Sequence, residues 1–135
     1  MQTLLISLHP RHSQNILAGK KTIELRKRPV DLSRFDHILI YETLPTAAII
    51  GYCEPWEGEV KTAQDWGNFK NSLCLTSEEI YNYLGDRMGY GIRIKNPQKI
   101  TPIPLSKMRE ASILPPQSFR YLSDIDLQNL GIRLQ

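Results

Sequence analysis

The stretch from Lys21 to Arg28 alternates between apolar and polar residues, and it constrains the fold more than any other segment. Ile23 and Leu25 are two residues apart, so in a β-strand both point to one face and toward a core. Lys21 stands at the entrance of the strand. The segment therefore predicts a half-buried strand whose other face carries a row of hydrogen-bonding side chains: Thr22, Glu24, Arg26 and Arg28.

The residues before this strand predict an earlier strand and a short helix. The segment 3–8 is mostly apolar and is followed by Pro10, which is typical of a buried strand that ends there. Pro10 suits the first position of a helix, and Gly19 suits a left-handed stop after it. We therefore expect the order strand, helix, glycine, strand at the N-terminus.

The rest of the chain predicts more strands and a few short helices. Thr76 and Glu79 form a capping-box pattern for a helix that stops at Gly85, and Ser123 with Asp126 would cap a last helix. We expect the other elements at residues 37–43 (strand), 48–54 (strand), 62–73 (helix, with a weak pattern) and 90–100 (strand, interrupted at 96–98), with the last helix ending at Gly131.

These elements predict an α+β fold, a partly closed β-barrel flanked by short helices, because strands outnumber the short helices. A chain of 135 residues with 41% hydrophobic residues supports one core, so we expect a single domain over residues 1–135. Prolines mark an extended segment over residues 102–116. This segment would either cover a cleft as a lid or pack against the barrel, and we favour packing.

Positive charge is concentrated near the N-terminus. The whole chain has a net charge of +3, whereas residues 1–34 contain seven Lys or Arg and two acidic residues, a net +5. A local positive field attracts a polyanion such as nucleic acid, although a solvated basic surface explains the run equally well.

Several functional classes are not indicated. No apolar run approaches the ~20 residues that span a bilayer, and a cytoplasmic protein without a membrane partner is the expectation. Cys53 and Cys74 lack metal-site spacing, so we expect two reduced thiols and no metal. His9, His12 and His37 suggest caps or surface positions. We expect no cofactor, because no nucleotide-binding motif is present.

The segments Leu5–Pro10 and Ile16–Arg28, with Gly19-Lys20-Lys21-Thr22-Ile23-Glu24 at their centre, resemble the signature of the ASCH family. Residues 115–119 resemble a subgroup of small predicted transcriptional regulators with an ASCH domain. The resemblance implies a PUA-like fold with a cleft between barrel and helices.

The family resemblance implies several activities, and whether this chain is an enzyme is left open. Some members are similar to RNA-binding modules, some remove an acyl group from modified cytidine, and some are described as ribonucleases. In the acyl-removing members a Lys activates a Thr nucleophile, and these align with Lys21 and Glu24. A carboxylate does not replace a hydroxyl nucleophile, so Thr22 is the substitute in a catalytic set of Lys21, Thr22 and Glu24. A further family Glu could correspond to Glu54, Glu57, Glu59, Glu78 or Glu79.

For RNA or nucleotide binding, the basic residues Lys20, Lys21, Arg26, Lys27 and Arg28 would neutralise phosphates, and Glu24 would accept a hydrogen bond from a base or ribose. Otherwise Lys21 and Glu24 form only a structural ion pair. Stacking candidates are Tyr41, Trp56, Trp66 and Tyr90, with core packing favoured for Tyr41, Tyr83 and Phe119 and a position near the cleft for Trp56. We expect a regulatory RNA- or nucleotide-binding protein; the alternatives are a hydrolase acting on a modified nucleoside or RNA, and a protein-interaction module.

Overall fold

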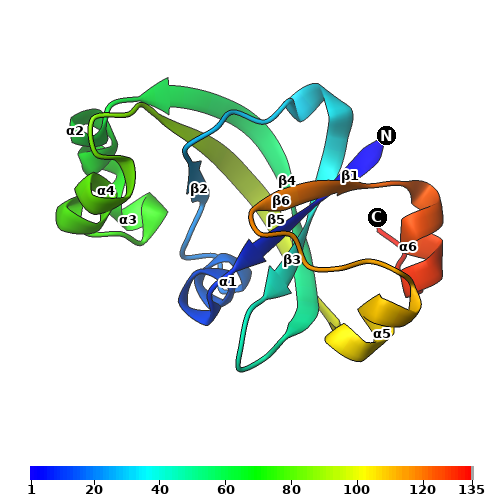
Figure 1. Ribbon diagram of the computed structural model, residues 1–135. Helices are drawn as coiled ribbons and strands as arrows, with labels where there is room; N and C mark the ends of the chain where they lie inside the picture. The colour runs from blue at the N-terminus through cyan, green and yellow to red at the C-terminus, as the bar shows by residue number, and fades with distance from the viewer. Residues whose placement is uncertain (135) are drawn as a thin grey trace.

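The structure, a computed structural model, describes residues 1–134 (Figure 1). No helix within residues 1–134 is both long enough and apolar enough to cross a membrane. The strands are β1 (Gln2–Leu8), β2 (Ile23–Arg26), β3 (Phe35–Glu42), β4 (Ala48–Lys61), β5 (Gly89–Pro104) and β6 (Phe119–Leu122). The helices are α1 (Pro10–Leu17), α2 (Ala63–Trp66), α3 (Lys70–Leu73), α4 (Ser77–Leu84), α5 (Leu105–Glu110) and α6 (Asp124–Leu130), with 3-10 turns η1 (Leu32–Arg34) and η2 (Gly67–Phe69).

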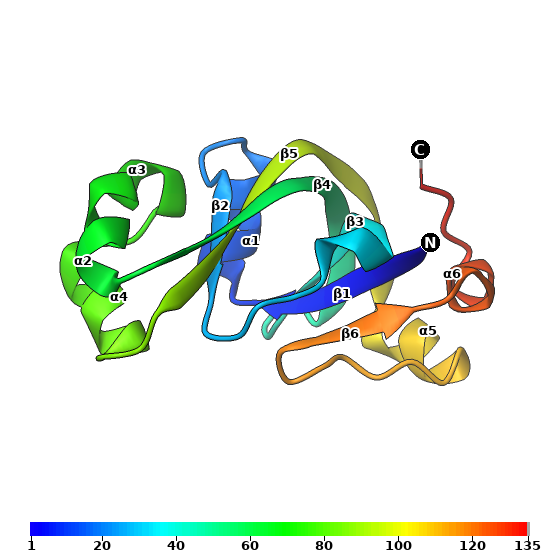
Figure 2. The ribbon, with the colours of Figure 1, turned by 90° about the horizontal axis from the view of Figure 1, so that it is seen from above.

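The strands form one six-stranded sheet in the order β2-β5-β4-β3-β1-β6. The pairing of β1 with β3 is parallel, and the other pairings are antiparallel. Seen from above, β4 and β5 arch over the molecule (Figure 2). The mixed α+β class is confirmed. The edge strands β2 and β6 do not pair with each other among the described residues, so the sheet is open and the predicted partly closed barrel is supported only in part.

Strands β4 and β5 are longer than predicted: β4 continues past residue 54 to Lys61, where it forms an arm with the first residues of β5, which also pair with β2, and β5 continues past residue 100 to Pro104. Glu57 to Lys61 of β4 pair with Arg93 to Gly89 of β5. The arm carries α2, α3 and α4 at one end of the molecule, while α5 and α6 lie at the other end (Figure 1). The predicted interruption at 96–98 is an irregularity within β5, with Asn96 at a φ of 52°, and not a break.

The predicted helix signals with a local cause are confirmed. Pro10 begins α1, and Gly19 follows it with a left-handed φ of 77°. Both predicted capping boxes are present, Thr76 with Glu79 at α4 and Ser123 with Asp126 at α6. Each box satisfies two amide groups that would otherwise lack partners, so a few neighbouring residues are enough to start the helix.

The extended segment predicted over residues 102–116 contains regular elements in its first part. Residues 102–104 belong to β5, and α5 follows directly. Strand β6, which was not predicted, pairs with Thr3 to Ile6 of β1. A four-residue strand has too short an alternation to be recognised without its partner.

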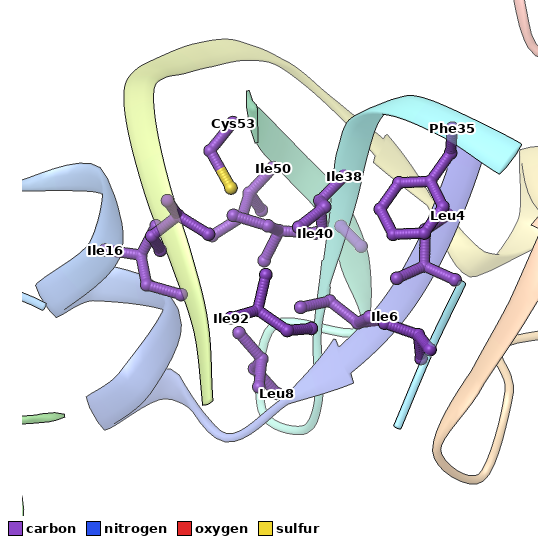
Figure 3. Close-up of a cluster of buried hydrophobic side chains, with 13 residues drawn as sticks. Leu4, Ile6, Leu8, Ile16, Phe35, Ile38, Ile40, Ile50, Cys53 and Ile92 are labelled. Carbon is purple, nitrogen blue, oxygen red and sulfur yellow. The ribbon is translucent and has the colours of Figure 1, made fainter. Parts of the chain in front are cut away.

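Two hydrophobic clusters lie on the two faces of the sheet. Leu4, Ile6 and Leu8 of β1 belong to the cluster that α1 covers, drawn in Figure 3. Leu5 of the same strand belongs to the opposite cluster, with the predicted core residue Tyr41 and with residues of α5 and α6 packed on it. A strand buried on both faces reads as a nearly continuous apolar run, as β1 does. A third cluster joins β2 to α2, α3 and α4.

A buried carboxylate ties α1 to the end of β3. Glu42 accepts hydrogen bonds from Ser13, from Thr46 and, at 2.8 Å, from Gln14 Nε2. Burial raises the pKa of Glu42, but the three hydrogen bonds outweigh it, so the pKa lies below its ordinary value. The carboxylate form therefore stabilises the folded state at neutral pH, and this contribution is lost as pH falls through the lowered pKa.

We expect Glu42→Gln to lower the free energy of unfolding by about 1–3 kcal/mol at pH 7, since an amide cannot accept all three hydrogen bonds. Urea titrations at pH 7 and near pH 3 would test this. The difference between variant and wild type should shrink at the lower pH, and an equal difference at both would contradict the assigned role of the charge.

Candidate functional site

A cavity of about 350 Å³ opens between α1, β2, the end of β1 and the segment that joins α3 to α4. We call it the cleft. Its apolar wall includes Leu75 and Tyr83. Its polar lining is formed by Ser7, His9, His12, Lys21, Glu24 and Arg26.

Three charged side chains form a chain across the cleft. Arg26 Nε lies 2.8 Å from Glu24 Oε2, and Lys21 Nζ lies 3.8 Å from Glu24 Oε1. Lys21 is 2% exposed and Glu24 is 6% exposed, so the ion pair expected from the sequence is present but buried. Lys21 Nζ also donates to the Leu73 carbonyl at 2.6 Å. Burial lowers the pKa of Lys21, and Glu24 partly opposes this.

The position of Lys21 follows from a strand that is shorter than predicted. Strand β2 begins at Ile23, so Lys21 precedes it and does not follow the strand alternation. The amide of Lys21 donates to the Asn15 carbonyl of α1 at 3.0 Å, and the amide of Thr22 donates to the Ser72 carbonyl of α3 at 2.9 Å. Both α1 and α3 therefore hold the backbone of this segment, and the Lys21 side chain is buried.

Thr22 does not line the cleft, contrary to the expectation that it shares a face with Glu24. It lines a separate cavity of about 280 Å³ with Cys53 and Asn96, and Lys21 lies between the two spaces. The strand alternation predicted the wrong side for Thr22 because residue 22 lies outside β2. The three residues of the catalytic set are thus neighbours in sequence, but only Lys21 and Glu24 meet in the cleft.

Two histidines line the cleft, and His9 also lies exposed at the cap position that the sequence suggested. His9 is the N-cap residue of α1 without a side-chain cap bond, and its Nδ1 lies 3.3 Å from Thr43 Oγ1. His12 is one turn further along α1 and is half-buried. Residues three positions apart lie on the same side of a helix, and this spacing is the sequence pattern from which the pairing of His9 with His12 could have been predicted.

The environment of His12 favours its neutral form. Burial lowers the pKa of His12, and the positive charge of Lys21 lowers it further. Glu24 acts in the opposite direction but does not restore the ordinary value. The imidazole is therefore unprotonated, and able to accept a proton, at neutral pH.

Two buried side-chain atoms lack a hydrogen-bond partner within the described residues, and both belong to residues that line the cleft. They are His12 Nδ1 and Arg26 Nη2. The other terminal nitrogen of the guanidinium, Arg26 Nη1, donates to Ser118 Oγ at 3.1 Å. Because an unpartnered buried polar atom costs free energy, its recurrence at one cavity points to a polar ligand.

The remaining predicted binding residues are spread over the surface. Lys27 lies with its Nζ 4.8 Å from the centre of the Tyr83 ring, and Arg28 is exposed. Tyr83 is 38% exposed and lines the cleft, so the prediction that it packs in the core is wrong. Lys20 lines a neighbouring groove.

The other aromatic candidates lie elsewhere. Trp56 is 55% exposed on β4 beside Arg93 and does not line the cleft, contrary to expectation. Tyr90 is partly buried against the core, and its hydroxyl donates to the Val30 carbonyl at 3.3 Å. Trp66 is fully buried.

None of the five other glutamates considered from the sequence lines the cleft. Glu59 accepts from Arg93 Nε at 2.7 Å, and Glu79 pairs with Arg11. No group of three or more His, Cys, Asp or Glu side chains within residues 1–134 is placed to hold a metal ion.

The segment before β6 packs along the rim of the cleft, in agreement with the packing that we favoured. Ser7 Oγ donates to the Pro116 carbonyl at 2.6 Å, and the Ser7 amide donates to the Ser118 carbonyl at 3.3 Å. With the bond from Arg26 to Ser118, these contacts attach the segment to β1 and to β2.

Comparison with known proteins identifies relatives over nearly the whole chain. The family model described as the ASCH domain matches residues 6–104. An ASCH domain-containing ribonuclease of Zymomonas mobilis subsp. mobilis is 32% identical over 132 residues, which cover 93% of this chain and 88% of that protein. None of the matches supports the narrower subgroup of transcriptional regulators.

Solved structures agree with this result. The crystal structure of ASCH from Zymomonas mobilis superposes with a TM-score of 0.86 at 29% identity, covering 96% of this chain and 93% of that chain. The N-terminal domain of McrB from Staphylothermus marinus has a TM-score of 0.61 at 9% identity, covering 96% and 92% of the two chains. The second match shows likeness of fold alone.

Proposed function

This chain belongs to the ASCH domain family, and from that premise we propose that it binds single-stranded RNA and cleaves it in the cleft. The Zymomonas relative is named a ribonuclease, which supports RNA as the substrate. A cavity of about 350 Å³ suits one unstacked nucleotide rather than a duplex, and single strands present their bases and phosphates separately.

The observation that carries the proposal is the pair of unpartnered atoms in the cleft, His12 Nδ1 and Arg26 Nη2. A phosphodiester oxygen would accept a hydrogen bond from the guanidinium. The adjacent ribose offers a 2′-hydroxyl, which could donate to a neutral imidazole. One ribose and its phosphate would therefore satisfy both atoms, and the desolvated surroundings strengthen both hydrogen bonds.

The same groups supply the chemistry of strand cleavage. His12 takes the proton from the 2′-hydroxyl, and the 2′-oxygen attacks phosphorus. The bond from phosphorus to the 5′-oxygen breaks, and His9 gives that oxygen a proton. The products are a 2′,3′-cyclic phosphate and a 5′-hydroxyl end. Lys21 and Arg26 stabilise the negative charge that develops on the phosphate oxygens.

The acyl-removing reaction fits the cleft less well. Thr22, the hydroxyl that would have to act as nucleophile, lines the other cavity. Glu24 is engaged by Arg26 at 2.8 Å and by Lys21 at 3.8 Å, so it acts as the counter-ion that holds both cations. Cleavage of RNA uses the residues that meet in the cleft and is the function that we favour.

The test compares wild type with Arg26→Ala on single-stranded RNA and, as the alternative, on acylated cytidines. We expect wild type to cleave RNA to cyclic phosphate ends, and Arg26→Ala to lower kcat/KM by roughly 10- to 100-fold, the worth of a hydrogen bond to a charged group. Product analysis by mass spectrometry gives the end groups.

The matched control is Arg109→Ala, which removes an exposed arginine of α5 at the far end of the molecule. It should cleave RNA like wild type. Release of the acyl group from cytidine without RNA cleavage would replace the proposed function by the acyl-removing one. Salt-sensitive RNA binding without product would leave a binding protein.

A further inference from the structure

A third cavity, of about 570 Å³, adjoins the cleft on the side of α3 and α4. We call it the basic groove. Its lining includes Arg11, Lys20, Lys70, Cys74, Leu75 and Thr76. Nothing in the proposed cleavage reaction uses it.

The basic groove and the cleft are neighbours at three points. Leu75 lines both. Arg11 of the groove and His12 of the cleft are consecutive on α1, and Lys20 of the groove precedes Lys21 of the cleft. These shared and consecutive lining residues place the groove beside the cleft.

The charge of the groove is positive. Lys20 and Lys70 are exposed, and neither forms an ion pair with any residue in the described part of the chain. Arg11 is already paired with Glu79, and its Nη2 donates to the Cys74 carbonyl at 2.8 Å. The two lysines therefore supply the net charge, while Arg11 joins α1 to the start of α4.

We propose that the basic groove binds a phosphate next to the one that is cleaved, so that the preferred substrate is a single strand of several nucleotides rather than a dinucleotide. This inference rests on the proposed function. Lysines act as mobile point charges that hold phosphates without reading bases, and the groove should therefore raise affinity for any sequence. Its contribution should weaken as salt rises.

The experiment measures kcat/KM on the dinucleotide UpU and on a hexauridine, with wild type and with the double variant Lys20→Ala/Lys70→Ala. We expect the double variant to lose about tenfold on hexauridine and to match wild type on UpU, which reaches only the cleft. Its binding of hexauridine should also depend less on salt, with the slope of log K against log salt smaller by about 0.7 for the one lost phosphate contact.

The control is Lys107→Ala/Arg109→Ala, which removes the same charge from α5 and should match wild type on both substrates. An unchanged hexauridine rate in the Lys20/Lys70 variant would overturn the inference and leave the proposed function standing. An equal loss on UpU and hexauridine would also overturn it, because the lysines would then act on the cleft itself. Failure of wild type on both substrates would overturn the proposed function and this inference with it.

Discussion

Replacing His12 with asparagine is expected to lower kcat for RNA cleavage by about 10²- to 10⁴-fold, the usual contribution of a positioned general base. The imidazole lines the cleft, its Nδ1 is buried and unpartnered among the described residues, and its pKa is lowered so that the neutral form is present at pH 7. Asparagine keeps a polar group but cannot take the proton. Single-turnover cleavage of a labelled single-stranded RNA would measure the loss.

The pH dependence of the wild-type rate distinguishes a base from a merely structural histidine. The pKa of His12 is lowered by burial first, then by Lys21 and Arg11, while Glu24 and Glu79 raise it in part. A base must be unprotonated, so kcat/KM should rise with pH through this lowered pKa, below the ordinary histidine value of about 6.5. Lys21→Met removes a positive charge and should move this acidic limb to higher pH, in addition to slowing the reaction.

His37→Asn is the matched control, because His37 lies on β3 and not in the cleft. It should keep the wild-type rate and pH profile. The catalytic role would be refuted if His12→Asn cleaved RNA within threefold of wild type, or if its rate fell while the acidic limb stayed in place.

The elements predicted correctly from the sequence are those whose cause is local. A capping box needs only Thr76 and Glu79, and the start and stop of α1 need only Pro10 and Gly19. Strand β1 was recognised because it is buried on both faces. Each signal lies within a few residues, and no tertiary contact was needed to read it.

The elements missed depend on contacts between distant parts of the chain. Strand β6 exists because Phe119 to Leu122 pair with β1 at the other end of the sequence. Strand β4 extends into the arm because Glu57 to Lys61 pair with β5, although these residues show little apolar alternation. A partly closed barrel was predicted from the number of strands, and no local pattern could show how far the sheet closes.

The candidate site was predicted in part, for the same reason. Lys21, Glu24 and Arg26 lie close in sequence, and they meet in the cleft. His9 and His12 enter it only because α1 packs beside β2, an arrangement that the strand alternation does not describe. The burial of Lys21 also depends on the Leu73 carbonyl of α3, which is 52 residues away in sequence.

Trp66→Ala should be the most destabilising of the substitutions considered, lowering the free energy of unfolding by about 3–5 kcal/mol. The indole is 0% exposed, its Nε1 donates to the Gly89 carbonyl at 3.0 Å, and it packs edge-to-face on Phe69 at 5.6 Å between ring centres. A side chain added at Gly91 would overlap with the ring, which shows how closely the arm packs on it. Urea denaturation followed by circular dichroism measures the change.

Trp56→Ala is the matched control, since it removes the same side chain from an exposed position, 55% accessible, and should cost less than about 1 kcal/mol. Similar losses for the two variants would contradict the assigned role of Trp66. Loss of Trp66 should also disturb the cleft, because the cluster around Trp66 includes Leu73, whose carbonyl accepts a hydrogen bond from Lys21 Nζ.

Trp66→Phe keeps a ring but loses the hydrogen bond. Its free energy of unfolding should fall by about 1–3 kcal/mol, while it should retain RNA cleavage at temperatures where it stays folded.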